Sequence, residues 1–495
     1  MKLHPSRRHL LQTGAAAGAL GFLSKIPLLG ADDVKLDPNQ VRFRPEIEPL
    51  VRLLEETPRE RLLEEVAGRI KKGTTYREIL SALLLAGVRN IQPRPVGFKF
   101  HAVLVVNSAH LASVNSPDSD RWLPIFWALD YFKSSQARDV QEGDWTMASV
   151  KESEVPSSDK ARKMFAEGMD HWDEAKVDAA TSGLARAAGA QEVFDLFAQY
   201  GARDFRDIGH KAIYVANSWR TLQAIGWKHS EPVLRSLGYA LLQHNGSNPQ
   251  QSSHEADLPG RLNEELQKTI RSDWQRGETK KEATIEMLTV LRGGTWEDAS
   301  RKVVELLNRK ISPQSIWDGL FQHASEMLMR QPGIISLHAS TTTNALHYAH
   351  QNTFNDETRK FLLLQNAAFL TMFRDRGGIK EGVKIDQFEP VEGVPGIEDI
   401  FSEISGNKEM AARKALAYLK STKDPKPFMR EAQRLIYLKG TGSHDYKFSS
   451  AVLEDYYNIS PQMRDRFLAA SVFWLQGSGK KNTSLVARTR TALGG

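Results

Sequence analysis

The chain has 495 residues, of which 41% are hydrophobic and 25% charged, as in an ordinary globular protein, so disorder is not expected. Four of its 66 basic residues and none of its 60 acidic residues lie in residues 1–31, so the remainder carries a net charge of only +2. That balance gives no support to nucleic acid as a partner. The sequence has no cysteine, which excludes disulfides, thiolate zinc sites, iron–sulfur clusters and cysteine nucleophiles.

The first residues predict a twin-arginine signal peptide over residues 1–31. Arg7 and Arg8 precede the apolar stretch 15–23, and an arginine pair before a short apolar segment resembles the bacterial twin-arginine signal. The twin-arginine translocase is then a partner during export, and the protein is periplasmic or otherwise exported. The alternative is a short N-terminal anchor helix, because cleavage after Ala31 has a poor consensus. No later segment offers about 18 uninterrupted apolar residues, so no integral membrane domain is expected.

The rest of the chain has a helical pattern nearly throughout. Residues 59–72 have apolar side chains at helical spacing and end at Gly73, and a Thr cap with Glu78 in the first turn begins the next helix. Further helical patterns cover 98–113, 120–132, 158–180, 191–200, 207–226, 230–244, 258–273, 279–291, 296–308, 313–329, 333–351, 356–373, 410–419, 427–438, 447–457 and 461–476. Alternation typical of strands is absent.

We therefore predict an all-α fold, a large multi-helix single domain with a buried polyhistidine site. The expected organisation is a signal peptide at 1–31, an N-terminal linker at 32–57, the helical domain at 58–477 and a flexible basic tail at 478–495. No short repeat period recurs, which argues against a solenoid.

Four histidines stand at or near the start of mostly apolar helical patterns, where they would point inward: His101, His210, His338 and His444. A buried imidazole needs a partner for each ring nitrogen, and four of them in one core suggest a shared metal. Polyhistidine sites suit iron, copper or zinc. The alternative for each histidine taken alone is a satisfied core or capping residue.

Helical geometry separates these four from their neighbours. His110 and His347 each lie nine residues after a candidate ligand, about 180° round a helix, so neither can share its face. Asn217 lies seven residues after His210 on the same face, which makes it a candidate partner behind the ligand. Lys447 shares a face with His444 if that helix begins at Ser443, a fair N-cap.

Three other histidines are weaker candidates. His171 and His229 stand among charged residues, so we expect both at the surface. His323 falls in the middle of a helical pattern and stays an outside candidate for the site.

The segments around the four histidines resemble the questin oxidase-like family. The resemblance rests on Phe100-His101, Gly209-His210, Leu337-His338 before a Ser/Thr-rich helix, and His444-Asp445-Tyr446-Lys447, and it spans residues 74–457. It implies a helical oxidase with a non-haem iron held by His101, His210, His338 and His444. It further implies that Lys447 is carboxylated on its amine and supplies an anionic oxygen ligand.

Three functional readings follow. The first is an exported non-haem iron oxidoreductase or oxygenase that uses dioxygen on an unknown aromatic or ketone-type small molecule. The second is a zinc metallohydrolase on the same histidine site, in which the metal activates water. The third is a non-catalytic helical scaffold or binding protein whose histidines are structural.

Overall fold

The computed structural model describes residues 39–242, 249 and 251–494 of the chain, so the predicted signal peptide at 1–31 lies outside the described residues. In the described residues the regular structure is helical, and β geometry is limited to isolated bridge positions, among them the bridge between Glu278 and Ile311. The all-α prediction is confirmed.

The helices are short to medium in length and follow one another closely. Those before residue 270 are α2 (Glu48–Glu56), α3 (Arg59–Lys71), α4 (Tyr76–Asn90), α5 (His101–Leu104), α6 (Val106–Val114), α7 (Leu123–Glu142), α8 (Ser158–His171), α9 (Glu174–Ala187), α10 (Ala190–Gly201), α11 (His210–Ile225), α12 (Ser230–Leu241) and α13 (Leu258–Leu266). Those after it are α14 (Lys281–Gly293), α15 (Trp296–Asn308), α16 (Pro313–Arg330), α17 (Ile334–Asn352), α18 (Asp356–Gly377), α19 (Ile397–Glu403), α20 (Lys408–Ser421), α21 (Lys426–Lys439), α22 (Ser443–Asp455), α23 (Pro461–Ala470) and α24 (Ser484–Leu493).

Local chemistry explains several of the helix starts. Thr75 accepts a hydrogen bond from the backbone of Glu78, whose carboxylate in turn accepts from the Thr75 backbone, so the predicted cap of α4 is present as a capping box. Thr295 and Asp298 do the same for α15. These caps satisfy backbone N–H groups that the first turn of a helix leaves without partners.

Two of the predicted boundaries are wrong. Residues 48–56 of the expected linker form α2, whose Val51 and Leu54 are fully buried in the core. Residues 484–493 of the expected flexible tail form α24, which packs on α3 and α7 and pairs Arg488 with Glu64. Both helices are short, so isolated segments of this length are marginally stable, and packing against other helices holds them in place.

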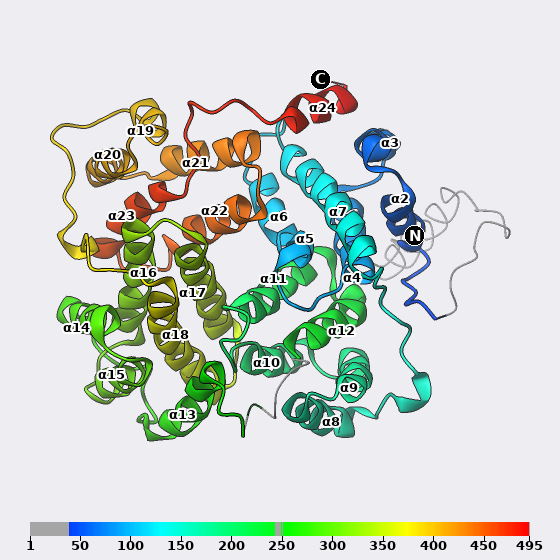
Figure 1. Cartoon of the computed structure of the whole chain (residues 1–495), viewed down its shortest axis with the longest axis horizontal. Helices are drawn as coiled ribbons and strands as arrows, with labels where there is room; N and C mark the ends of the chain where they lie inside the picture. The colour runs from blue at the N-terminus through cyan, green and yellow to red at the C-terminus, as the bar shows by residue number, and fades with distance from the viewer. Residues whose placement is uncertain (1–38, 243–248, 250, 495) are drawn as a thin grey trace, which may run out of the picture. The chain divides into compact units, whose positions relative to one another are not determined.

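Four helices meet at the centre of the unit that spans Val41–Gly495. The chain places α6, α11, α17 and α22 against one another although they come from four distant parts of the sequence, and α5 leads directly into α6 (Figure 1). The expected single helix over 98–113 is instead a 3-10 turn followed by α5 and α6, which are separated at Val105. Helix α17 has buried residues on every side, as expected for a central helix.

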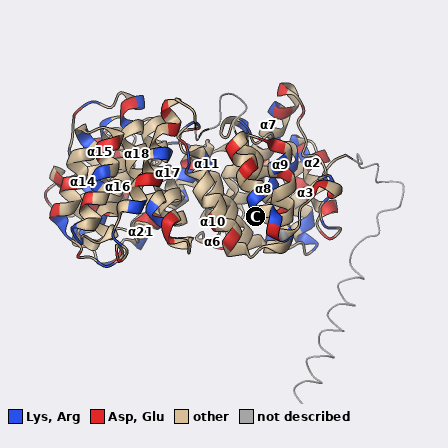
Figure 2. Ribbon diagram, turned by 90° about the horizontal axis from the view of Figure 1, so that it is seen from below, with Lys and Arg blue, Asp and Glu red and all other residues tan. Residues whose placement is uncertain are grey.

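Charges are distributed in mixed signs over the outer helices. Figure 2 shows Lys and Arg interspersed with Asp and Glu along α14, α15, α8 and α9, and mostly uncharged residues on the inner ribbon of α10 and α11. Within the described part of the chain, no helix combines the length and the apolar character needed to cross a membrane.

Candidate metal centre

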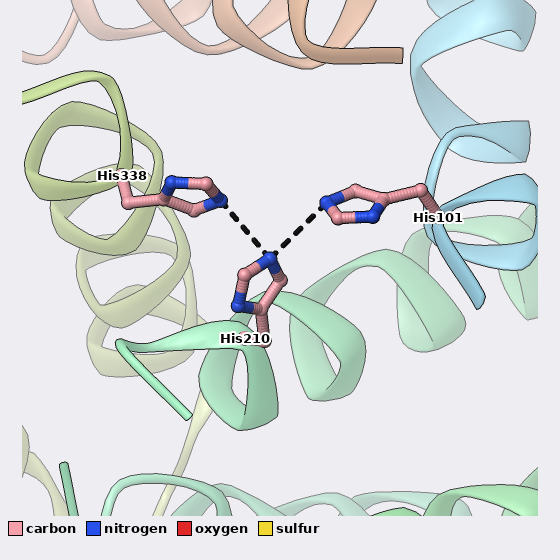
Figure 3. A group of neighbouring side chains, drawn as sticks. All are labelled: His101, His210 and His338. Carbon is pink, nitrogen blue, oxygen red and sulfur yellow. Dashed lines mark hydrogen bonds between the residues drawn. The ribbon is translucent and has the colours of Figure 1, made fainter. Parts of the chain in front are cut away.

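Three histidines converge on one point in the interior. His101 begins α5, His210 begins α11 and His338 lies in the first turns of α17, and the three rings point toward one another (Figure 3). The Nε2 atom of His210 lies 3.2 Å from Nε2 of His101 and 3.0 Å from Nε2 of His338. All three side chains are buried, and their ligand atoms lie within 4.8 Å of one another.

Backbone carbonyls fix which ring nitrogen carries the proton. Nδ1 of His101 lies 2.8 Å from the Phe98 carbonyl, Nδ1 of His210 lies 2.8 Å from that of Asp207, and Nδ1 of His338 lies 2.7 Å from that of Ile334. A carbonyl oxygen only accepts, so each Nδ1 donates and must be protonated. In a neutral imidazole, Nε2 then carries no proton and presents a lone pair. The lone pairs of all three rings face the same point.

The rings are neutral. Burial holds the pKa of His101 and of His338 well below the ordinary histidine value, and neighbouring cationic groups lower both further. Burial likewise lowers the pKa of His210 to about 3. The Nε2 lone pair of His210 is in contact with those of His101 and His338, and such lone pairs repel one another unless a cation lies between them, so the arrangement suits a metal ion.

The spacing also fits one. Two imidazole nitrogens, each about 2.1 Å from a common cation, lie roughly 3.0 Å apart at a 90° angle and about 3.4 Å apart at the tetrahedral angle. The observed separations of 3.0 and 3.2 Å fall in this range, toward its right-angled end.

Unusual backbone conformations precede two of the ligands. Gly97 has φ +124° and Phe98 φ +45° before His101, and Ile208 has φ +44° and Gly209 φ +78° before His210. These left-handed turns place the Phe98 and Asp207 carbonyls where the histidine Nδ1 atoms reach them, and strain of this kind gathers at functional sites. A Cβ on Gly209 would stand 2.0 Å from Oγ1 of Thr342, so only glycine lets α11 approach α17 this closely.

His444 lies beside the three converging rings. Its ring centroid is 4.6 Å from that of His101 and 5.1 Å from that of His338, although it is not one of the three residues within the 4.8 Å group. Its Nε2 is buried and has no hydrogen-bond partner among the described residues, and burial lowers its pKa to about 3. The ring is thus a neutral donor held next to the centre.

Asp445 fixes the turn that carries His444. The helix α22 does begin at Ser443, but the cap is formed at Gly442 rather than by the Ser443 side chain. The Asp445 carboxylate accepts from the backbone of Thr441 and Gly442. Sequence reasoning missed this role, although an Asp three residues after a glycine turn is a recognisable capping signal.

Lys447 faces the same interior. Its side chain is 3% exposed, and its Nζ finds no hydrogen-bond partner in the part of the chain that the structure describes. Burial lowers its pKa to about 7, so a large fraction of this amine is neutral near neutral pH. A neutral lysine amine can bind a metal or react with an electrophile, which a protonated one cannot.

Asn217 is not the partner of His210 that its spacing suggested. Its Nδ2 donates at 2.9 Å to the carbonyl of Leu104, which is the last residue of α5. It therefore holds the short helix that carries His101, whereas the Asp207 carbonyl holds His210.

A buried ion pair anchors the loop before His210, and the sequence did not indicate it. Lys211 Nζ donates to both carboxylate oxygens of Asp204 at 2.9 Å, and both side chains are essentially inaccessible to solvent. The pair ties the start of α11 to the beginning of the loop that contains Asp207.

The other histidines weighed from the sequence lie apart from this group. His110 is hydrogen-bonded to Tyr76 at 3.0 Å, and His347 packs edge-on against Trp317, so both face away as their spacing predicts. His171 is exposed, whereas His229 is buried, which makes the predicted surface position of His229 wrong. His323 is fully buried with neither ring nitrogen partnered by the described chain, but it is not a member of the converging set.

The comparisons with known proteins give no relative. The chain matches no protein-family model, no curated protein and no solved structure.

Proposed function

We propose that the chain is a non-haem iron oxidoreductase whose metal is held by His101, His210 and His338, with His444 and Lys447 completing the centre. The observation that carries the proposal is the convergence of three neutral imidazoles whose Nε2 lone pairs lie 3.0 and 3.2 Å apart. No arrangement of protons on neutral rings satisfies all three lone pairs, because each Nδ1 proton is already donated to a carbonyl.

Two features favour iron over zinc. The separations lie toward the value for right-angled ligands, and two further buried nitrogens without partners among the described residues, on His444 and Lys447, lie near the three that converge. Zinc sites in proteins are usually four-coordinate and tetrahedral, whereas imidazole-rich sites with more ligands suit iron. Bound iron would supply the one-electron chemistry by which dioxygen reacts with an organic substrate, and an aromatic or ketone-type small molecule is the expected substrate class.

The protein's own residues would prepare the site for that chemistry. The Phe98, Asp207 and Ile334 carbonyls hold the three rings in one tautomer and orientation, so little reorganisation is needed when the metal binds. Burial of the surrounding helices excludes bulk water. Lys447, as a neutral amine or as the carboxylated side chain implied by the questin oxidase-like resemblance, would supply a further donor; a carbamate would also balance the charge of the metal.

The proposal is tested by metal analysis and oxygen consumption. Purified protein is loaded with Fe(II) without oxygen, desalted and assayed for bound metal, and oxygen uptake is then followed with candidate aromatic and ketone substrates. We expect about one iron per chain and substrate-dependent oxygen uptake. Zinc retained in place of iron, without oxygen uptake, would favour the metallohydrolase, and a chain that holds no metal after loading would favour the scaffold reading.

Variants identify the ligands in the same assay. His210→Ala is expected to lose the metal, whereas His171→Ala, which changes an exposed histidine, is expected to retain it. Equal metal content in the two variants would show that the centre is not where we place it.

A further inference from the structure

A small cavity follows the four ligand helices away from the histidines. Residues seven positions after each of the four histidines all line it, two helical turns farther on in α11, α17 and α22 and beyond the break at Val105 for His101. They are Ser108 on α6, Asn217 on α11, Ala345 on α17 and Ala451 on α22. The cavity thus lies between α6, α11, α17 and α22, of which the last three carry candidate ligands and α6 follows the helix of His101, and we call it the bundle seam.

The bundle seam is narrow, and both polar and apolar side chains line it. It encloses about 10 Å³ and is lined in part by Thr341 and Ser450, a space on the scale of a single water molecule. Lys447 lines it as well, with its Nζ unpartnered among the described residues. Lys447 is thus a lining residue that lies three residues after a candidate ligand, His444, on α22.

At that end two donors meet on one carboxylate oxygen. Arg220 Nη2 and Asn344 Nδ2 both donate to Oε2 of Glu454, the latter at 2.7 Å. Arg220, Asn344 and Glu454 all line the seam. A guanidinium and an amide that converge on one oxygen form a recognition site for a carboxylate.

The Arg220 side of this arrangement is fixed, while the Glu454 side is not. The guanidinium lies 3.9 Å above the Tyr348 ring, and its Nη1 also donates to Asn217 and Asn344. The Glu454 side chain is 36% exposed, against 9% for Arg220, and its rotatable bonds allow it to turn into solvent. Its departure would leave the two donors in place and without a carboxylate.

Charge at this end favours an incoming anion. Asp455 is the other carboxyl beside Asn344, which donates to it at 2.8 Å. It is fully buried, and burial raises its pKa well above the ordinary value, which weakens its competition for Arg220. With Glu454 turned away, the Arg220 guanidinium would face the seam without the carboxylate that it now binds.

We propose that Arg220 and Asn344 form a carboxylate-binding subsite at the outer end of the bundle seam, and that Glu454 occupies it in the absence of ligand. The ligand is a small molecule that bears a carboxylate or a similar planar oxyanion. The inference that the substrate of the metal centre carries a carboxylate rests on the proposed function. The inference that a carboxylate binds here rests only on the contacts of Arg220.

Formate is the probe, and opposite changes in its affinity are the test. Glu454→Gln removes the competing charge and should tighten formate binding about tenfold, whereas Arg220→Gln removes the principal donor and should weaken it at least about tenfold. Arg488→Gln, which breaks the exposed pair with Glu64, is the matched control and should bind as the wild type does. Binding is measured by calorimetry, and thermal melting confirms that each variant is folded.

The titrations are made on metal-loaded and on chelator-treated protein, so that formate on the metal is distinguished from formate on Arg220. Tighter binding by Glu454→Gln in both forms supports the subsite, and this variant decides alone if Arg220→Gln does not fold. Unchanged affinity in Glu454→Gln would overturn it. If the chain holds no metal but binds formate through Arg220, the proposed function is wrong and the subsite is supported. If the chain holds metal but binds no formate through Arg220, the subsite is wrong and the proposed function is supported.

Discussion

Replacing His338 with alanine, with His347→Ala as its partner variant, separates loss of a ligand from loss of a buried ring. Both histidines lie on α17, nine residues apart and on opposite faces, and their exposures are 2% and 4%. His338 meets His210 at the centre, whereas His347 packs against Trp317 and Phe321. The two substitutions therefore remove the same group from the same helix in different surroundings.

The expected effects on metal affinity are large and one-sided. Structural metal sites of four ligands bind with roughly 10–16 kcal/mol, so one ligand is worth about 3 kcal/mol, or more than a hundredfold in affinity. His338→Ala should therefore lose the metal at micromolar concentrations, whereas His347→Ala should retain it.

The effects on stability run the other way in metal-free protein. Truncation of a well-packed buried ring costs about 3 kcal/mol or more, which we expect in full for His347→Ala. His338→Ala should cost less, because it also removes one of three lone pairs that face one another without a cation.

Metal content after Fe(II) loading and urea unfolding of the chelated proteins measure the two effects. The reasoning would be refuted if the variants lost metal equally, or if His338→Ala in metal-free protein were the less stable of the two.

Three further predictions concern the support of the site. Gly209→Ala should lower the free energy of unfolding by at least about 2 kcal/mol, because its Cβ would collide with Thr342 at a positive φ; an unchanged urea midpoint would contradict this. Lys211→Met should cost about 3–5 kcal/mol, since it leaves the buried Asp204 carboxylate unpaired, and adding Asp204→Leu should recover most of that loss in the same assay. Burial lowers the pKa of His210 to about 3, so on acidification this histidine binds a proton in the unfolded chain before it does so in the folded protein. The free energy of unfolding of metal-free protein should therefore be unaffected above about pH 6.5. Below that pH it should fall by about 1.4 kcal/mol per pH unit per such histidine as the pH drops toward 3. Urea midpoints that stay flat from neutral pH to pH 5 would contradict that sign.

The sequence predicts most of the helices, because the spacing of their apolar residues and their capping residues can be recognised within each segment. It also places each of the four candidate histidines at or near a helix start, which the structure bears out for His101 and His210 at the first position of their helices. The break at Val105 and the packing of α24 depend on contacts with distant helices, which no local pattern contains.

The site shows the same division. Spacing excludes His110 and His347 from the centre, because the helical repeat fixes which face a residue occupies. Spacing alone gave Asn217 the wrong partner, since a shared face does not say which neighbouring helix a side chain will reach. The pairing of Lys211 with Asp204 is likewise a tertiary contact, and the sequence offers only a lysine beside a histidine.

The central claim is that His101, His210 and His338 bind one metal ion, and X-ray absorption of iron-loaded protein tests it most directly. The account predicts a first shell that contains at least three imidazole nitrogens at about 2.1 Å, as in other metal–imidazole bonds, and the loss of that signal in His210→Ala. A shell made only of oxygen, or a spectrum that His210→Ala leaves unchanged, would contradict it.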